Sequence, residues 1–184
     1  ERLIRTVGEP RERFEEDALR IIRGLRFQAQ LDFKIVDNTF DAMRKQIADI
    51  QYLSIERIVV ELKKLIKGIN VAQSFNQMKE IDAFKHIPFF NSFNMQRVHI
   101  DEPLEFEMWI AIMLAQQPIT DTLKLLKISN NEKSKIHTLA NLIETLPKVQ
   151  SKSDLIIVIY DNDIKNIKNV LATKETLKKH NLNT

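Results

Sequence analysis

Apolar residues recur at intervals of three and four along most of the chain, which is the spacing of α-helices with one buried face. The clearest such stripe begins near Glu15. At about 100° per residue, one side of this predicted helix carries Ala18, Ile21, Ile22, Leu25 and Ala29. We therefore expect a helix over roughly residues 15–29 that packs this face against a core.

Residues 54–68 form the second strongly patterned stretch. Ser54 is a favourable N-cap, and Glu56 follows it in the first turn. Three lysines occupy the last turns, and Gly68 is suited to a left-handed C-terminal stop. Charges of these signs at the two ends complement the helix dipole. This is the helix that the sequence predicts most clearly.

The remaining pattern is helical as well. The run 104–115 is apolar all round, which predicts a buried helix starting at residues 101–103. Asn38 is expected to cap one helix, Ser129 and Glu132 to form a capping box for another, and Ser153 to cap a helix through the LIIVIY run at 155–160. Helices are expected at 39–48, 70–80, 81–86, 119–127, 130–146 and from 164 onward.

These patterns predict an all-α fold of several helices, preceded by an extended N-terminal segment over residues 1–14. Three glycines and five prolines are few for 184 residues, which argues against a sheet-rich fold with many tight turns. No repeat of fixed period is present. The apolar runs are too short to span a membrane, and we expect a cytoplasmic protein.

The net charge is only +3, but the type of cationic residue differs between the two halves of the chain. Seven of the ten arginines lie within residues 1–26, whereas all eleven cationic residues beyond residue 120 are lysines. Arginine suits fixed contacts to phosphates and base edges, and lysine more often serves as a mobile solvated charge. The N-terminal part therefore has the composition of a binding site, and the C-terminal part that of a basic surface.

Several kinds of chemistry find no support in the sequence. The chain has no cysteine, which excludes disulfides and thiolate zinc sites. The histidines are scattered without i,i+4 pairing, and we predict no metal site from His86, His99, His137 and His180. No glycine-rich phosphate loop is present. The DND run at 161–163 is better explained as a turn and helix cap than as a metal site.

The arginine-rich helix remains as the candidate site. Asp17 and Arg20 are three residues apart, so a surface ion pair worth roughly 0.3–0.5 kcal/mol is the simplest interpretation. The alternative is that this acceptor and donor read the edge of a nucleobase. Arg23 and Arg26 would then face a triphosphate, and Gly24 would leave room for the ligand.

Two motifs carry a resemblance to a known family. Residues 7–27 contain a V-G-x-P segment followed by R-F-x-E-D-x-x-R-x-x-R-x-x-R-F, and residues 56–62 read E-R-x-x-x-E-L. Together these motifs resemble the neck region of class II tRNA nucleotidyltransferases, the CCA-adding enzymes, and of the related bacterial poly(A) polymerases.

The resemblance implies roles for individual residues. Asp17 and Arg20 would pair with the base of incoming CTP or ATP, and Arg23 and Arg26 would contact the nucleotide at its phosphates. Glu56, Arg57 and Glu61 would form a buried ion-pair network that supports the neck and does not contact the substrate.

The resemblance also implies a domain organisation. Residues 1–14 would end a catalytic head, 15–68 would form the neck, and 69–184 would form a helical body on the tRNA side with a shortened tail. The Asp-x-Asp pair that holds two Mg²⁺ ions lies in the head of such enzymes, ahead of these motifs. We therefore expect no catalytic residue and no metal ligand in this chain, and no nucleotide addition by it alone. The expected partners are ATP, CTP and the tRNA 3′ acceptor end.

Other functions remain open at this point. A poly(A) polymerase shares the motifs but uses ATP alone. The chain could instead be a helical RNA-binding or protein-interaction module without a nucleotide site, or a helical scaffold without nucleic-acid contact. The sequence does not indicate an oligomeric state.

Overall fold

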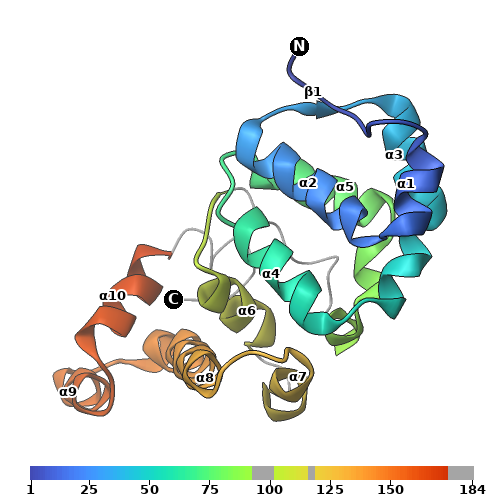
Figure 1. Cartoon of the computed structure of the whole chain (residues 1–184). Helices are drawn as coiled ribbons and strands as arrows, with labels where there is room; N and C mark the ends of the chain where they lie inside the picture. The colour runs from blue at the N-terminus through green and yellow to red at the C-terminus, as the bar shows by residue number, and fades with distance from the viewer. Residues whose placement is uncertain (93–101, 116–118, 174–184) are drawn as a thin grey trace.

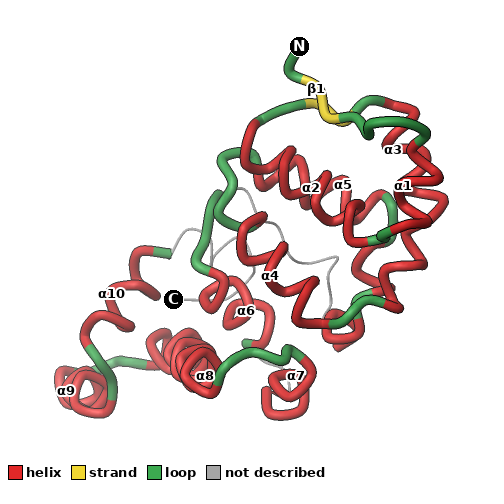
Figure 2. Tube along the Cα trace, in the orientation of Figure 1, coloured by secondary structure: helices red, strands yellow, loops and turns green. Residues whose placement is uncertain are grey.

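The computed structural model describes residues 1–92, 102–115 and 119–173, and it is mostly helical, as predicted (Figure 1). The N-terminal segment contains strand β1 (Leu3–Ile4), which pairs in parallel with β2 (Lys34–Ile35). Figure 2 shows how small this strand contribution is beside the helices. Strand pairing anchors the extended N-terminal segment beside the helices that follow.

The first group of helices surrounds α2 (Leu19–Leu31), which packs against α4 (Ile55–Leu65) and α5 (Val71–Glu80). Helix α1 (Pro10–Glu16) packs against α3 (Asp37–Gln46). Short 3₁₀ segments complete this part, at Ile47–Tyr52, Ala83–His86 and Pro88–Ser92. Helices on both sides of the predicted boundary at residue 68 thus share one core, and the division into domains stays a prediction.

The predicted apolar stripe of α2 is buried. Ile21, Ile22, Leu25 and Ala29 have no solvent exposure, and Ala18 is nearly buried. Burial of side chains of this size contributes about 1.5–3 kcal/mol for each isoleucine or leucine. The stripe therefore explains why α2 lies at the centre of its group of helices.

The single helix predicted over residues 15–29 is instead two helices, separated at Asp17. Asp17 adopts an extended conformation with φ −155° and ψ 100°. Its Oδ1 atom accepts a hydrogen bond from the backbone N–H of Leu19 at 3.1 Å. Aspartate side chains compete in this way for backbone donors, which favours a helix boundary over a helix interior. Periodicity alone did not reveal the break because the apolar stripe continues past it.

Gly68 has a different role from the predicted left-handed stop. The helix α4 already ends at Leu65, and Gly68 is not among the described residues with positive φ. A Cβ atom at Gly68 would lie 2.5 Å from the backbone carbon and oxygen of Ala29. The glycine therefore allows the chain after α4 to cross directly over α2, where Asn70 N–H donates to Ala29 O at 2.9 Å.

The second group of helices follows along the chain and includes α7 (Ile119–Leu125) and α9 (Lys152–Asp161). Helix α6 (Phe106–Leu114) is buried except at Glu107, which confirms the predicted buried helix, although it begins at Phe106. It packs against α8 (Asn130–Thr145), which in turn contacts α10 (Ile164–Ala172). A 3₁₀ turn, Leu146–Lys148, follows α8.

Helix caps were predicted with mixed success. Ser129 and Glu132 form the expected capping box at the start of α8. The LIIVIY run is helical as predicted, but its cap is Ser151 with Asp154 and not Ser153. Asn38 lies inside α3, whose N-cap is Val36. The predicted helix at 81–86 is a 3₁₀ turn.

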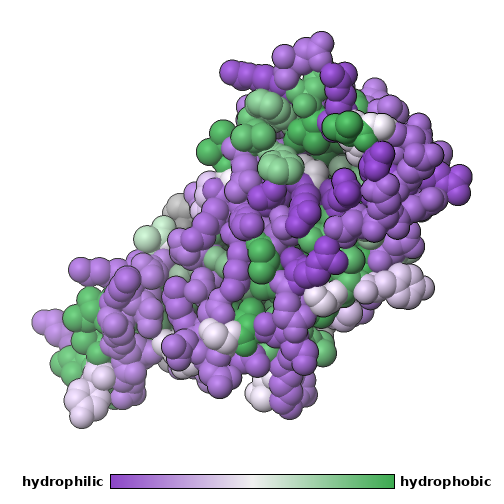
Figure 3. Space-filling view, viewed as in Figure 1, coloured by the Kyte–Doolittle hydropathy of each residue, from purple (hydrophilic) through white to green (hydrophobic). Residues whose placement is uncertain are grey.

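The apolar residues of α9 are mostly exposed and form a green area at the lower left of Figure 3. Despite its apolar run, neither α9 nor any other helix in the described ranges is long and apolar enough to cross a membrane. His99 and His180, like the end of the helix predicted from residue 164 onward, lie outside the described residues.

Candidate functional site

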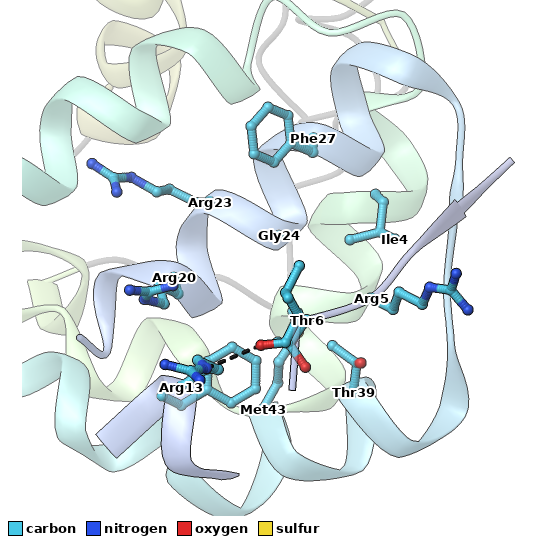
Figure 4. A pocket seen from close by; sticks show the side chains of 12 residues that line it. Ile4, Arg5, Thr6, Arg13, Arg20, Arg23, Gly24, Phe27, Thr39 and Met43 are labelled. Carbon is cyan, nitrogen blue, oxygen red and sulfur yellow. Dashed lines mark hydrogen bonds between the residues drawn. The ribbon is translucent and has the colours of Figure 1, made fainter. Parts of the chain in front are cut away.

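A cavity of about 470 Å³ lies between the N-terminal segment, α2 and α3 (Figure 4). One wall is the face of α2 formed by Arg20, Arg23, Gly24 and Phe27, at the i, i+3, i+4 and i+7 positions of a helix. The other walls come from the N-terminal segment, α1 and α3, and they consist of Ile4, Arg5, Thr6, Val7, Arg13, Phe14, Thr39 and Met43.

Four arginines from three parts of the chain line this cavity. Figure 4 shows Arg13, Arg20 and Arg23 along one side and Arg5 on the opposite side. Arg13 is held in place because its Nε donates to Val7 O at 3.0 Å and a terminal nitrogen lies 2.6 Å from Glu16 Oε1. Apolar walls together with several cations suit a ligand that joins a flat ring to an anionic group.

Sequence reasoning missed Arg5, Arg13 and the exposed ring of Phe27 as cavity residues. The crowding of arginine into residues 1–26 was the available signal, since both arginines belong to that group. Their convergence depends on the parallel pairing of β1 with β2, which brings the N-terminal segment over α2.

Asp17 lies at the α1–α2 junction, outside the cavity lining, and its partner is Arg57. A terminal nitrogen of Arg57 lies 3.1 Å from Oδ1 and 3.0 Å from Oδ2 of Asp17. The simple ion pair between Asp17 and Arg20 is not found among the described contacts. Arg20 instead lies 3.5 Å from Glu16 Oε2, and the carboxylate of Asp17 is occupied by Leu19 N–H and Arg57.

A second ion-pair group centres on Glu61, whose side chain is 6% exposed. Glu61 lies 3.2 Å from Arg23 Nε and 3.0 Å from Arg26 Nε. The guanidinium of Arg26 also stacks 4.1 Å from the ring centre of Phe27. Arg26 is only 14% exposed and is not part of the cavity lining, so the structure separates it from Arg20 and Arg23.

Glu56 does not join these contacts. It is exposed in the first turn of α4 and has no ion pair within the described part of the chain. The expected buried network is therefore two separate groups, Asp17 with Arg57 and Glu61 with two arginines. Of these, only Glu61 and Arg26 are largely buried, at 6% and 14% exposed.

Gly24 makes room for a side chain of the core. A Cβ atom at this position would overlap the terminal methyl group of Met43 from α3. Gly24 also lines the cavity, so its lack of a side chain both admits Met43 and shapes the α2 wall.

The described residues contain no group of three or more His, Cys, Asp or Glu side chains that could hold a metal ion.

Comparisons with known proteins agree with the motifs. A family model described as "Probable RNA and SrmB- binding site of polymerase A" matches residues 32–94. The CCA-adding enzyme of Staphylococcus epidermidis is 58% identical over 183 residues, which cover 100% of this chain and 46% of that protein. The chain thus spans about half the length of the curated relatives that it matches.

Two solved structures show the same fold. The CCA-adding enzyme of Bacillus stearothermophilus in complex with CTP matches with a TM-score of 0.73 and 20% identity, over 98% of this chain and 49% of that one. The Thermotoga maritima CCA-adding enzyme complexed with tRNA_CCA matches with a TM-score of 0.64 and 18% identity, over 98% and 50% of the two chains. At these identities the structural likeness concerns the fold alone.

Proposed function

Because the chain belongs to the CCA-adding enzyme family, we propose that it forms the nucleotide-selecting and tRNA-binding part of such an enzyme. The observation that carries the proposal is the arginine-lined cavity, whose α2 wall contains Arg20 and Arg23 of the motif. Relatives solved with CTP and with tRNA_CCA support it, as does the RNA-binding family model over residues 32–94.

Asp17 and Arg20 have the chemistry to select a base. Cytosine and adenine both present an amino donor beside a ring-nitrogen acceptor, which a carboxylate and a guanidinium complement. Uracil and the Watson–Crick edge of guanine present a carbonyl where the amino group would lie, and a carboxylate repels it. Arg57 and Leu19 N–H occupy part of the acceptor capacity of Asp17, and Oδ2 keeps a lone pair for the base.

Among the arginines further along α2, Arg23 is the better candidate for a phosphate contact. Its side chain is 46% exposed and lines the cavity while it also contacts Glu61. Arg26, at 14% exposed, would have to leave the buried carboxylate of Glu61 to reach a phosphate. We therefore assign Arg26 to holding Glu61 and Phe27 in place, and Arg23 to the nucleotide.

The proposal is tested by nucleotide selection. Asp17→Ala and Arg20→Ala, placed in a longer enzyme that contains this chain, are expected to change the ratio of CMP to AMP incorporation and to admit UMP or GMP. Glu56→Gln is the matched control because Glu56 is exposed and unpaired among the described residues. Selection that is unchanged in both alanine variants would favour an RNA-binding or protein-interaction module without a nucleotide site.

A second candidate, part of a poly(A) polymerase, is favoured by the description of the family model alone. Titration of the chain with CTP and ATP separates the two. Binding of both nucleotides supports CCA addition, whereas binding of ATP alone supports poly(A) addition.

A further inference from the structure

The helix α9 exposes nearly all of its apolar side chains, in the green area at the lower left of Figure 3. Val158 is the one buried residue of this helix. Single exposed apolar residues are common on protein surfaces, but several on one ten-residue helix form a patch of the kind that marks an interface. We call this surface the α9 patch, and it consists of Leu155, Ile156, Ile157, Ile159 and Tyr160.

Ile156 and Tyr160 form the centre of the α9 patch. They are the most exposed apolar residues of α9, at 66% and 89%. They lie four residues apart, so one stands above the other on the same helix face. At about 100° per residue, each points about 160° away from Val158, which packs into the core. The centre of the patch therefore faces directly away from the rest of the chain.

Charges of opposite sign stand at the two ends of the patch. Lys152 is the first residue of α9, Asp161 is the last, and Asp163 follows two positions later. All three side chains are exposed. Among the described residues, neither Lys152 nor Asp161 has an ion-pair partner. The patch thus has a positive end and a negative end.

A helix face with unlike ends is complementary to a second copy of itself when the two helices run antiparallel. If the two copies cross at the level of Val158, Ile156 of each lies level with Tyr160 of the other. Lys152 lies about 9 Å from this crossing, on the side where Asp163 of the other copy is found. A parallel pairing would place the two lysines together and the two aspartate ends together, which like charges disfavour.

We propose that the α9 patch is the contact between two copies of this chain, with the two α9 helices antiparallel about a twofold axis near Val158. A pair of helices about 15 Å long buries less than the roughly 1,200 Å² of stable interfaces, so the dimer is weak, with a Kd on the order of 10–100 μM. The helix α9 lies at the opposite end of the molecule from β1 and the nucleotide cavity (Figure 1). The dimer therefore leaves both cavities open, and it does not depend on the function proposed for them.

The test measures the average mass of the 184-residue chain by sedimentation equilibrium, at about 5 to 500 μM. The mass of the wild type is expected to rise from 21.6 kDa toward about twice that value. Ile156→Ser with Tyr160→Ser is expected to raise the dimer Kd about tenfold or more. The matched control is Tyr52→Ser with Ile69→Ser, at positions 81% and 74% exposed in the first group of helices, and it should change the Kd less than about twofold.

A change of charge tests the antiparallel arrangement. Lys152→Glu places like charges at both contacts between the helix ends, and we expect it to raise the Kd about fivefold at low salt. It also lowers the net charge of +3, which by itself would favour association. Lys45→Glu changes the same charge at an exposed position of α3, and it should leave the Kd unchanged or lower it.

The other outcomes would overturn the proposal. A wild type that stays at 21.6 kDa over the whole range would exclude the dimer, and binding of that monomer to lipid vesicles would assign the patch to a membrane surface. Equal loss in the two serine variants would show that the contact lies elsewhere, and tighter association of Lys152→Glu would exclude the antiparallel arrangement. Protection of the patch from hydrogen exchange in a longer monomeric enzyme would assign it to another segment of that enzyme. Far-UV circular dichroism of each variant verifies that the helices are retained.

Discussion

One terminal nitrogen of Arg57 lies within 3.1 Å of both carboxylate oxygens of Asp17, although the two residues are 40 positions apart. Arg57 belongs to α4, and Asp17 lies at the junction of α1 and α2. The proposed base-reading carboxylate is therefore held by two helices, through Leu19 N–H of α2 and through Arg57 of α4.

Replacing Arg57 by lysine is expected to make nucleotide selection less strict, with little loss of free energy of unfolding. The Arg57 and Asp17 side chains are 48% and 24% exposed, so their ion pair contributes at most about 1 kcal/mol. Lysine keeps the charge but cannot hold the carboxylate with a planar guanidinium. The ratio of CMP to AMP incorporation by a longer enzyme that contains the chain measures the effect. Arg44→Lys, which disturbs ion pairs with Asp41 and Glu80, is the control, and equal ratios in both variants would contradict the prediction.

Glu61→Gln is expected to destabilise the fold strongly. It removes the counter-charge of Arg26, whose side chain is 14% exposed, and breaking such a buried pair costs about 3 kcal/mol. Urea unfolding followed by circular dichroism measures the change. Glu56→Gln, at an exposed position in the first turn of the same helix, should lower stability by less than about 1 kcal/mol, because it removes only a favourable charge near the helix N-terminus. A loss of the same size in both variants would mean that the charge of Glu61 is not what stabilises this region.

Replacement by alanine is expected to destabilise the fold more at Gly68 than at Gly24. At Gly68 the added Cβ would lie 2.5 Å from backbone atoms of Ala29, which cannot rotate away, and we expect a loss of about 2–3 kcal/mol. At Gly24 the added Cβ meets only the end of the Met43 side chain, and the gain in helix propensity of about 1 kcal/mol offsets part of the cost. Thermal unfolding compares them, and a larger loss for Gly24→Ala would refute the ranking.

Acid unfolding is expected to depend on Glu132. A hydrogen bond from Lys63 is the largest cause that lowers the pKa of Glu132, to about 2 from 4.5, and Ser129 adds further hydrogen bonds. A carboxyl group with a lowered pKa in the folded state stabilises the protein above pH 4.5, and this contribution is lost as the pH falls toward 2.

The difference in unfolding free energy between the wild type and Glu132→Gln should therefore be on the order of 1–2 kcal/mol above pH 5 and vanish near pH 2. Urea midpoints measured from pH 2 to pH 7 give this profile. Profiles that stay parallel over the whole range would show that Glu132 does not contribute through its charge.

Local signals in the sequence predicted most of the helices. The stripe of α2, the all-round apolar character of α6 and the capping box of Ser129 with Glu132 are each written in residues a few positions apart. Features of this kind can be predicted from the sequence because residues three or four apart on a helix are neighbours in space.

The ion pairs of the candidate site join residues that are far apart in the sequence, so they could not be predicted in the same way. No spacing rule connects Asp17 with Arg57 or Arg26 with Glu61, since helices must first pack for these pairs to form. The break at Asp17 depends on one residue's torsion angles, and the periodicity of the stripe does not record it. The motif resemblance directed attention to α2, and it did not indicate the cavity wall contributed by Arg5 and Arg13.

The distance in sequence between α2 and α4 has a consequence for the order in which the protein acquires its site. Translation proceeds at roughly 5–20 residues per second, so Arg57 is synthesised about 2–8 s after Asp17. Between the synthesis of Arg26 and that of Arg57, a nascent chain carries every arginine of the α2 motif but neither Arg57 nor Glu61 to orient Asp17 and Arg23. Nucleotide selectivity is thus expected to arise only after α4 has been synthesised and has docked, and not when the motif of α2 itself leaves the ribosome.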